Sequence, residues 1–148
     1  MVRCKSTSRL PSVVLTQTDT TVGFISQDAS RLAEIKSRPH HKPFIKIINS
    51  LENLRVPKKY KKIIRRSKKT TFIVNNQAFR ISKKIISSQI LRDTLWHYST
   101  SANESNKNFD REFCEQKTDI IIEDKNGLKE LSASSLIKLN KVKRRKIR

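Results

Sequence analysis

Cationic side chains and prolines gather in one short stretch, Lys36–Phe44 (KSRPHHKPF). Lys36, Arg38 and Lys42 fall within seven residues, and the two prolines restrict the backbone of the loop. A lysine supplies a point charge and an arginine a planar fork, a combination that suits a polyphosphate. Taken alone, a solvated basic loop is the simpler interpretation of this stretch.

Two other stretches place small polar side chains at the ends of expected strands. Residues 16–23 (TQTDTTVG) lie between a strand and a helix, where N–H and hydroxyl groups can surround a small polar ligand. Residues 99–103 (STSAN) also follow a strand, and their hydroxyl and amide groups can bind phosphate or ribose oxygens. Each stretch also fits an ordinary polar turn. His40 and His41 are interpreted as loop residues, because adjacent side chains rarely bind one metal ion.

The elements that must position these stretches alternate between short apolar runs and helix-like segments. This alternation predicts a mixed α/β fold in one domain, a twisted sheet covered by helices. Helices are expected at 28–35, 50–54, 57–69, 83–92 and 110–116. Strands are expected at 12–16, 44–48, 70–74, 78–82, 95–100, 119–122, 135–139 and 142–147, with a turn at 75–77.

The net charge indicates anionic partners. The chain has 148 residues, enough for one modest core, and carries 33 Lys and Arg against 13 Asp and Glu, a net charge of +20. Such a balance favours nucleotides, RNA or lipid headgroups as ligands and excludes an acidic solvating tail. The chain also has 20 Lys, 17 Ile and only 2 Gly, a bias that an AT-rich genome produces, so part of the charge is attributed to compositional drift.

Cysteine content and hydropathy point to a soluble protein of the reducing cytoplasm. Cys4 and Cys114 cannot form a disulfide framework, and their spacing matches no zinc motif. No apolar run reaches the roughly 20 residues of a membrane span, and the first residues lack a signal-peptide core. No membrane partner is therefore expected.

The order of the three motifs is more specific than any one of them. A strand followed by T-D-T, a K-S-R-P-x-x-K-P-hydrophobic loop after the next helix, and a late S-T-S-A-N resemble the YrdC/YwlC family of threonylcarbamoyl-AMP synthases. Residues 70–74, 78–81 and 134–137 are similar to three further strands of that family, so the resemblance runs roughly from residue 10 to residue 139. It departs from the family at Val22, where an aromatic residue is usual, at Lys68-Lys69, where Gly-Pro is usual, and at Asn106, where a glycine is usual.

The resemblance implies a YrdC-like twisted mixed sheet flanked by helices, with a positively charged cleft. Residues 1–148 would form a single domain with a basic C-terminal tail from about residue 140. The family condenses L-threonine, bicarbonate and ATP, with a divalent cation, to threonylcarbamoyl-AMP and pyrophosphate for modification of tRNA. Both reacting groups are anions, so a positive cleft is needed to bring them together.

Site residues follow from the resemblance position by position. Lys36 and Arg38 are expected to be catalytic by neutralising charge in the transition state. The residues expected to bind ATP are Arg38, Lys42, Thr71, Ser101 and Asn103. Those expected on the threonine side are Thr18, Thr20, Arg80 and Ser134, and Arg148 is a weaker nucleotide-side match. No residue is predicted to hold a metal, and Mg²⁺ is expected to arrive with ATP.

Two alternatives remain beside the synthase. One is a non-catalytic RNA-binding protein of the same fold, in which a basic helix at 58–69 and the tail at 141–148 contact phosphates. The other is a ribosome-associated structural protein with an accidental match. For the synthase itself, tRNA and the proteins that transfer the threonylcarbamoyl group are further expected partners.

Overall fold

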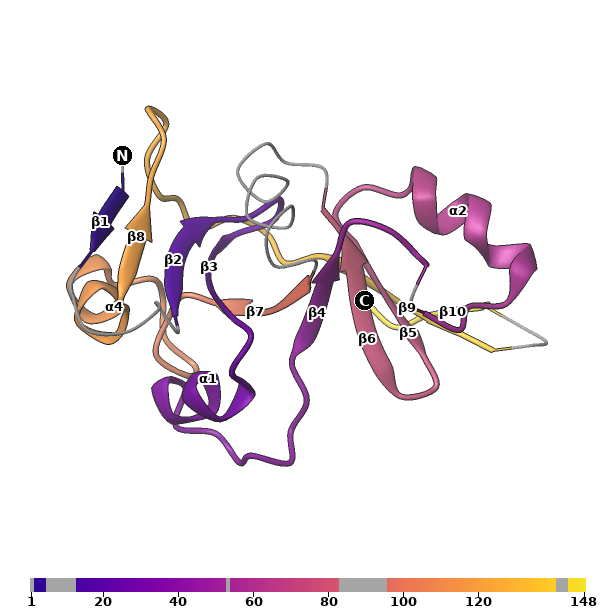
Figure 1. The fold of residues 1–148 in the computed structure, drawn as a ribbon, viewed down its shortest axis with the longest axis horizontal. Coiled ribbons are helices and arrows are strands. Elements are labelled where there is room, and N and C mark those ends of the chain that lie inside the picture. Colours follow the sequence, from indigo (N-terminus) through magenta and orange to yellow (C-terminus); the bar gives the residue numbers. More distant parts are fainter. Residues whose placement is uncertain (1, 5–12, 53, 83–95, 141–143) are drawn as a thin grey trace.

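The fold is built on one twisted sheet, in which the first and last described strands, β1 and β10, lie at opposite ends of the strand order (Figure 1). The computed structural model describes residues 2–4, 13–52, 54–82, 96–140 and 144–148. Its ten described strands follow the order β1-β8-β2-β3-β7-β4-β6-β5-β9-β10. They are β1 (Val2–Cys4), β2 (Val14–Gln17), β3 (Val22–Ser26), β4 (Ile45–Ile48), β5 (Thr70–Val74), β6 (Gln77–Ile81), β7 (Trp96–Ser101), β8 (Ile120–Ile122), β9 (Ser135–Leu139) and β10 (Arg144–Lys146). The sheet is mixed, because β2–β8, β4–β6 and β5–β9 pair in parallel and the other neighbours are antiparallel.

Local sequence explains where the helices begin. The helix α1 (Ala29–Ile35) is capped by Asp28, whose side chain accepts a hydrogen bond from the N–H of Arg31. The helix α4 (Arg111–Lys117) is capped in the same way by Asp110. After Pro57 the chain forms a short 3₁₀ turn, η1 (Lys58–Tyr60), which continues into α2 (Lys61–Arg66). No helix among the described residues is long and apolar enough to cross a bilayer.

Two hydrophobic cores lie along the sheet, one at each end. The first is formed by α1, α4, β2, β3 and β8, with Phe24, Leu15 and Leu32 fully buried. The second is formed by η1, α2, β4, β5, β6 and β9, around Phe72, Phe79 and Ile64. We call residues 13–47 and 97–133 the first region and residues 48–82 and 134–148 the second region. Figure 1 shows α1 and α4 near one end of the sheet and α2 near the other.

Strand registers place the described helices on one face of the sheet. Side chains alternate between faces along a strand, and registered neighbours share a face. Phe79 is registered with both Phe72 and Lys46, and Lys46 with Tyr98, so the residues of both cores share one face. Ser99 is registered with Ile45 on the opposite face. That second face carries the polar side chains Thr71, Arg80, His97 and Ser99, all buried.

Most predicted elements are present, with bounds shifted by one or two residues, except that the helix expected at 57–69 ends three residues early, at Arg66. The turn between β5 and β6 uses Asn75 and Asn76 at φ 51° and 64°, the left-handed geometry of a two-residue type I′ hairpin. The predicted terminal hairpin is β9 paired with β10. Because β10 is an edge strand of two arginines and a lysine, its charge discourages pairing with another chain.

Three expectations about elements need correction or remain outside the structure. The helix expected at 50–54 is wrong, because the described residues there form bends and turns. The strands β1 and β3 were not predicted; β3 was missed because its residues, all buried, overlap the polar motif at 16–23. The helix expected at 83–92 lies outside the described residues.

Candidate active site

A cavity of about 460 Å³ opens on the sheet face opposite the described helices, in the size range of about 300–1,000 Å³ typical of small-molecule sites. Its wall comes from the β2–β3 loop, the loop after α1, β4, β6, the end of β7 and the segment leading into β9. Seven of the predicted site residues line it: Thr18, Thr20, Arg38, Lys42, Arg80, Ser101 and Ser134. Among the described lining residues there are four basic side chains, the fourth being Arg148, and no acidic one.

The K-S-R motif is the end of α1. The N–H of Ser37 donates to the carbonyl of Glu34, and the N–H of Arg38 donates to that of Ala33. These two bonds form a Schellman motif, which places Ser37 in the left-handed region at φ 48°. The tight reversal separates the two cations: Arg38 lines the cavity, whereas the ammonium of Lys36 contacts the loop after β7.

The buried side chain of Lys36 holds the S-T-S-A-N stretch in place. Its Nζ donates to the carbonyl of Ser101 (3.0 Å), the carbonyl of Asn103 (2.6 Å) and the Oδ1 of Asn103 (2.7 Å). In turn, the hydroxyl of Ser105 donates to the carbonyl of Lys36 (2.6 Å). The pKa of Lys36 is lowered to about 8, mainly by burial; the nearby Cys114 raises it and Arg38 lowers it by smaller amounts. The three acceptors of Nζ account for all three ammonium hydrogens of Lys36 within the protein.

Arg38 lies flat against the cavity wall with part of its guanidinium unpaired. Its guanidinium carbon is 4.5 Å from the centre of the Phe44 ring, and one terminal nitrogen donates to the carbonyl of Pro43 (3.2 Å). The buried Nε of Arg38 has no hydrogen-bond partner in the described structure, and burial lowers the pKa of the group. A negative charge in the cavity would oppose the lowering of that pKa, because it favours the charged guanidinium. The exposed side chain of Lys42 lies at the same wall.

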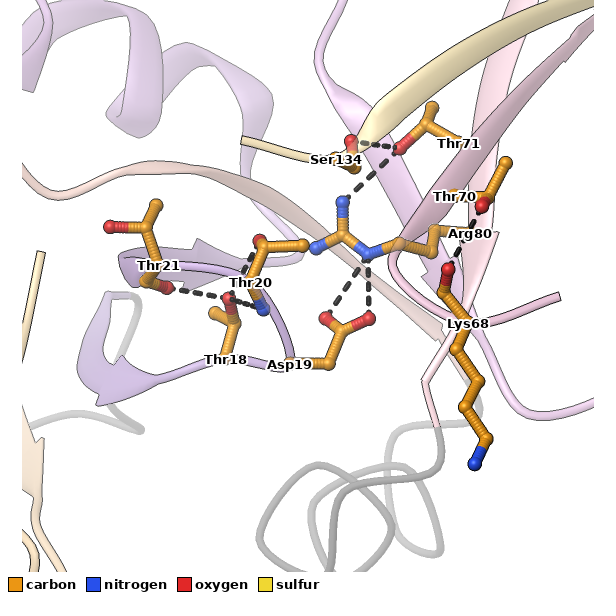
Figure 2. Close-up of polar contacts among 9 residues, drawn as sticks. All are labelled: Thr18, Asp19, Thr20, Thr21, Lys68, Thr70, Thr71, Arg80 and Ser134. Carbon is orange, nitrogen blue, oxygen red and sulfur yellow. Dashed lines mark hydrogen bonds and ion pairs between the residues drawn. The ribbon is translucent and has the colours of Figure 1, made fainter. Parts of the chain in front are cut away.

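Arg80 is held by protein groups on two sides, as Figure 2 shows. Its Nε lies 3.1 and 3.0 Å from the two carboxylate oxygens of Asp19, and its NH1 donates to the hydroxyl of Thr71 (3.2 Å). The hydroxyls of Thr71 and Ser134 are 2.8 Å apart. The side chains of Arg80 and Asp19 are only 5% and 14% exposed, so this is a buried ion pair. It joins the β2–β3 loop of the first region to β6 of the second.

The T-D-T loop is closed by its own hydroxyl groups. The hydroxyl of Thr18 donates to the carbonyl of Thr21 (2.6 Å), accepts from the N–H of Thr20 (3.2 Å) and lies 3.2 Å from the hydroxyl of Thr20. Gly23 allows this loop to approach β7, since a Cβ there would lie 3.0 Å from the carbonyl oxygen of Thr100. The loop is thus fixed against the cavity on the side of Arg80.

Three predicted site residues do not line the cavity. Lys36 and Asn103 bind each other beside it, and Thr71, fully buried, supports Arg80 and Ser134. Sequence reasoning missed Asp19 as a site residue. Its position between two predicted threonines, as the one acid of that loop, is a signal that could have marked it as a site residue, although not which residue it pairs with.

Two of the departures from the family pattern, Val22 and Asn106, have local structural explanations. Val22 is buried in the first core and is not among the lining residues, so the loss of an aromatic there does not open the described cavity wall. Asn106 takes the left-handed conformation (φ 64°) that a glycine would adopt freely, and asparagine tolerates it better than most residues. Lys69 has φ 50°, a strained value for a lysine.

Comparison with known proteins gives likenesses of fold. No protein-family model and no curated protein sequence matches the chain. Among solved structures, Sua5 of P. abyssi complexed with L-threonine matches with a TM-score of 0.75 and 20% identity, over 93% of this chain and 50% of Sua5. E. coli YciO matches with a TM-score of 0.75 and 17% identity, over 93% of this chain and 82% of YciO. The chain has a YrdC-like fold.

The YrdC-like chain also matches part of a larger protein. Full-length HypF in its phosphate- and nucleotide-bound form gives a TM-score of 0.77 at 14% identity, over all of this chain and 25% of HypF. The chain therefore spans about half the length of the Sua5 structure and a quarter of HypF. The predicted α/β class and YrdC-like sheet are confirmed, and the positive potential of the cleft stays a prediction.

Proposed function

We propose that this YrdC-like protein is an L-threonylcarbamoyladenylate synthase acting in the cytoplasm. The observation that carries the proposal is the cavity wall, where motifs distant in sequence meet as four cations and several hydroxyls with no described acid. L-Threonine bound to Sua5 and nucleotide bound to HypF, proteins of like fold, support the choice of ligands. Pyrophosphate is the second product, and tRNA modification would consume the adenylate.

The chemistry requires two bond-forming steps between anions. The amine nitrogen of threonine attacks the carbon of bicarbonate, water leaves, and a carbamate forms. A carbamate oxygen then attacks the α-phosphorus of ATP, and the bond to the β,γ-phosphates breaks to release pyrophosphate with Mg²⁺. Negative charge accumulates on the α-phosphate and the leaving group, so preorganised cations lower the barrier. Mg²⁺ enters in this scheme as part of the Mg·ATP substrate.

The geometry favours different roles for the cations. In this proposal Arg38 and Lys42, which both line the cavity, contact the phosphates of ATP. Arg80, with the hydroxyl groups of Thr18, Thr20 and Ser134 on the same cavity wall, is proposed to bind threonine. Lys36 uses its three hydrogens on protein acceptors, which favours a role in positioning the Ser101–Asn103 loop for the nucleotide over direct contact with substrate.

The proposal is tested by measuring pyrophosphate release from Mg·ATP and bicarbonate, with and without L-threonine. Release that depends on threonine, falling by about 10²–10³-fold in Arg38→Ala, is the expected result for loss of one charge-stabilising donor. Arg31→Ala, which removes an exposed arginine of α1 outside the cavity, is the matched control and keeps full activity. Parallel reactions with L-serine define the amino-acid preference.

Absence of pyrophosphate release from folded protein would contradict the synthase. The non-catalytic RNA-binding alternative, which shares the fold, would then take its place. An unchanged rate in both Arg38→Ala and the double variant Lys36→Ala/Arg38→Ala would show that the reaction occurs elsewhere on the chain.

A further inference from the structure

Most of the net positive charge of the protein lies in the second region. The second region contains 17 Lys and Arg against a single acid, Glu52, whereas the first region contains 10 Lys and Arg against 11 Asp and Glu. Compositional drift acts on the whole gene and would enrich both regions. The segregation therefore indicates that the charge of the second region serves a purpose of its own.

Cations of α2 and β10 lie on the same face of the sheet. Tyr60 and Ile64 turn inward to the second core, which leaves Lys58, Lys62 and Arg66 exposed at successive four-residue intervals. Ile137 and Leu139 of β9 join the same core, and their registered neighbours on β10 are Lys146 and Arg144. Registered neighbours share a face, so these two exposed cations lie on the α2 side. We call Lys58, Lys62, Arg66, Arg144 and Lys146 the basic face.

We propose that the basic face binds the phosphate backbone of RNA. It is on the opposite side of the sheet from the cavity, so RNA and ATP can be bound at once. The choice of RNA over DNA rests on the proposed function, whose product is destined for a tRNA. The charge and its placement do not depend on that function.

Other partners fit this surface less well. A membrane-binding amphipathic helix needs a free apolar side, but the apolar side of α2 is packed in the second core. A protein interface is built around clustered aromatic and apolar anchors, and Ile147 is the one large hydrophobic residue of the second region found exposed in the described structure. Tyr60, the one aromatic residue of η1 and α2, is buried, so these helices present no aromatic ring on which RNA bases could stack. The contacts are therefore to phosphates, with little dependence on RNA sequence.

The test compares two variants that each lose five exposed cations. The face variant carries K58Q, K62Q, R66Q, R144Q and K146Q, and the control carries R31Q, K107Q, K117Q, K125Q and K129Q in the first region. Binding to a fluorescent RNA duplex is measured by anisotropy at several salt concentrations, with circular dichroism and thermal melting to confirm folding. The two variants have the same net charge, so their difference isolates position from overall charge.

We expect the logarithm of the wild-type affinity to fall with the logarithm of the salt concentration at a slope of about −4.5, about 0.9 for each of five phosphate contacts. The face variant should bind about 100-fold more weakly at 0.1 M salt with a shallower slope, and the control within about 5-fold of the wild type. Equal weakening of both variants would overturn the proposal, as would tighter binding to a DNA duplex or to poly-glutamate. Pyrophosphate release measured on the face variant separates the two proposals, because the cavity is unaltered in it.

Discussion

The first and second regions share one sheet but differ in how their charged side chains are arranged. The first region is nearly neutral, and its cations are placed singly, as Lys36 is against three acceptors. The second region accumulates exposed cations on η1, α2 and β10 while its core remains apolar. The cation that orders a loop, Lys36, is therefore buried and partnered, whereas the cations proposed to bind RNA are exposed and repeated along η1, α2 and β10.

The cavity lies where these two regions meet. Arg38 and Lys42 come from the first region, and Arg80 and Arg148 come from the second. The buried pair of Asp19 and Arg80 is a direct polar link between them. Each of the following predictions tests how far the two regions differ or depend on each other.

Breaking the Asp19–Arg80 pair should have the largest effect. Asp19→Asn leaves a buried guanidinium without its counter-charge, and we expect the free energy of unfolding to fall by about 3–5 kcal/mol. Urea denaturation measures the change. The exposed pair of Lys107 and Glu104 is the control, because Glu104→Gln should cost less than about 1 kcal/mol. Equal small losses at both pairs would show that the link between regions is not energetically important.

Acid should weaken the protein through His97 of β7. Burial lowers the pKa of His97 to about 4, and the positive charge of Arg80 from the second region acts in the same direction. The unfolded state, with a pKa near 6.5, binds a proton first, so stability is lost as the pH falls from about 6.5 toward 4. Denaturation midpoints across this range should fall more steeply in the wild type than in His97→Phe. Parallel curves would exclude His97 as the cause.

Raising the pH should stabilise the protein through Lys36, whereas lowering it should destabilise the protein through His97. Its folded pKa of about 8 lies below the ordinary value of 10.5, so the unfolded state binds more protons between these values. Stability should therefore rise as the pH increases above 8. The informative range is pH 7.5–9, because the pKa of Cys114, raised to about 11 by burial from 9.0, makes an opposing contribution only at higher pH. Lys36→Met should abolish the rise, and a rise that persists would assign it to another group.

The smallest effects concern left-handed residues, one in each region. Ser37 and Lys69 have φ 48° and 50°, and glycine would remove the strain while increasing the entropy of the unfolded chain. We expect Ser37→Gly and Lys69→Gly each to raise the free energy of unfolding by about 0.5–1 kcal/mol. Asn106→Gly should change it less, because asparagine already tolerates φ 64°. Thermal unfolding measures the stability of the three variants against the wild type. A loss of stability in Ser37→Gly would contradict the prediction that its left-handed backbone is strained.

Local sequence determined the features that depend on near neighbours. Asp28 and Asp110 predicted two helix starts, the Asn75-Asn76 pair predicted the β5–β6 turn, and the order of the T-D-T, K-S-R-P and S-T-S-A-N motifs predicted the YrdC-like fold. These signals can be recognised in a single sequence because the hydrogen bonds of caps and turns are formed between residues a few positions apart. The charge segregation between the regions is equally a property of the sequence, although the boundary of the regions is not.

Only the tertiary structure decided which polar residues meet. Asp19 and Arg80 are 61 positions apart, and Lys36 and Asn103 are 67 apart, so no local pattern could pair them. The sheet order decided that β3 lies between β2 and β7 and that the polar strand face, with Thr71 and Arg80, forms the cavity side. The physical reason is that buried charge must find a partner somewhere in the fold, and the identity of that partner is set by strand register rather than by sequence spacing.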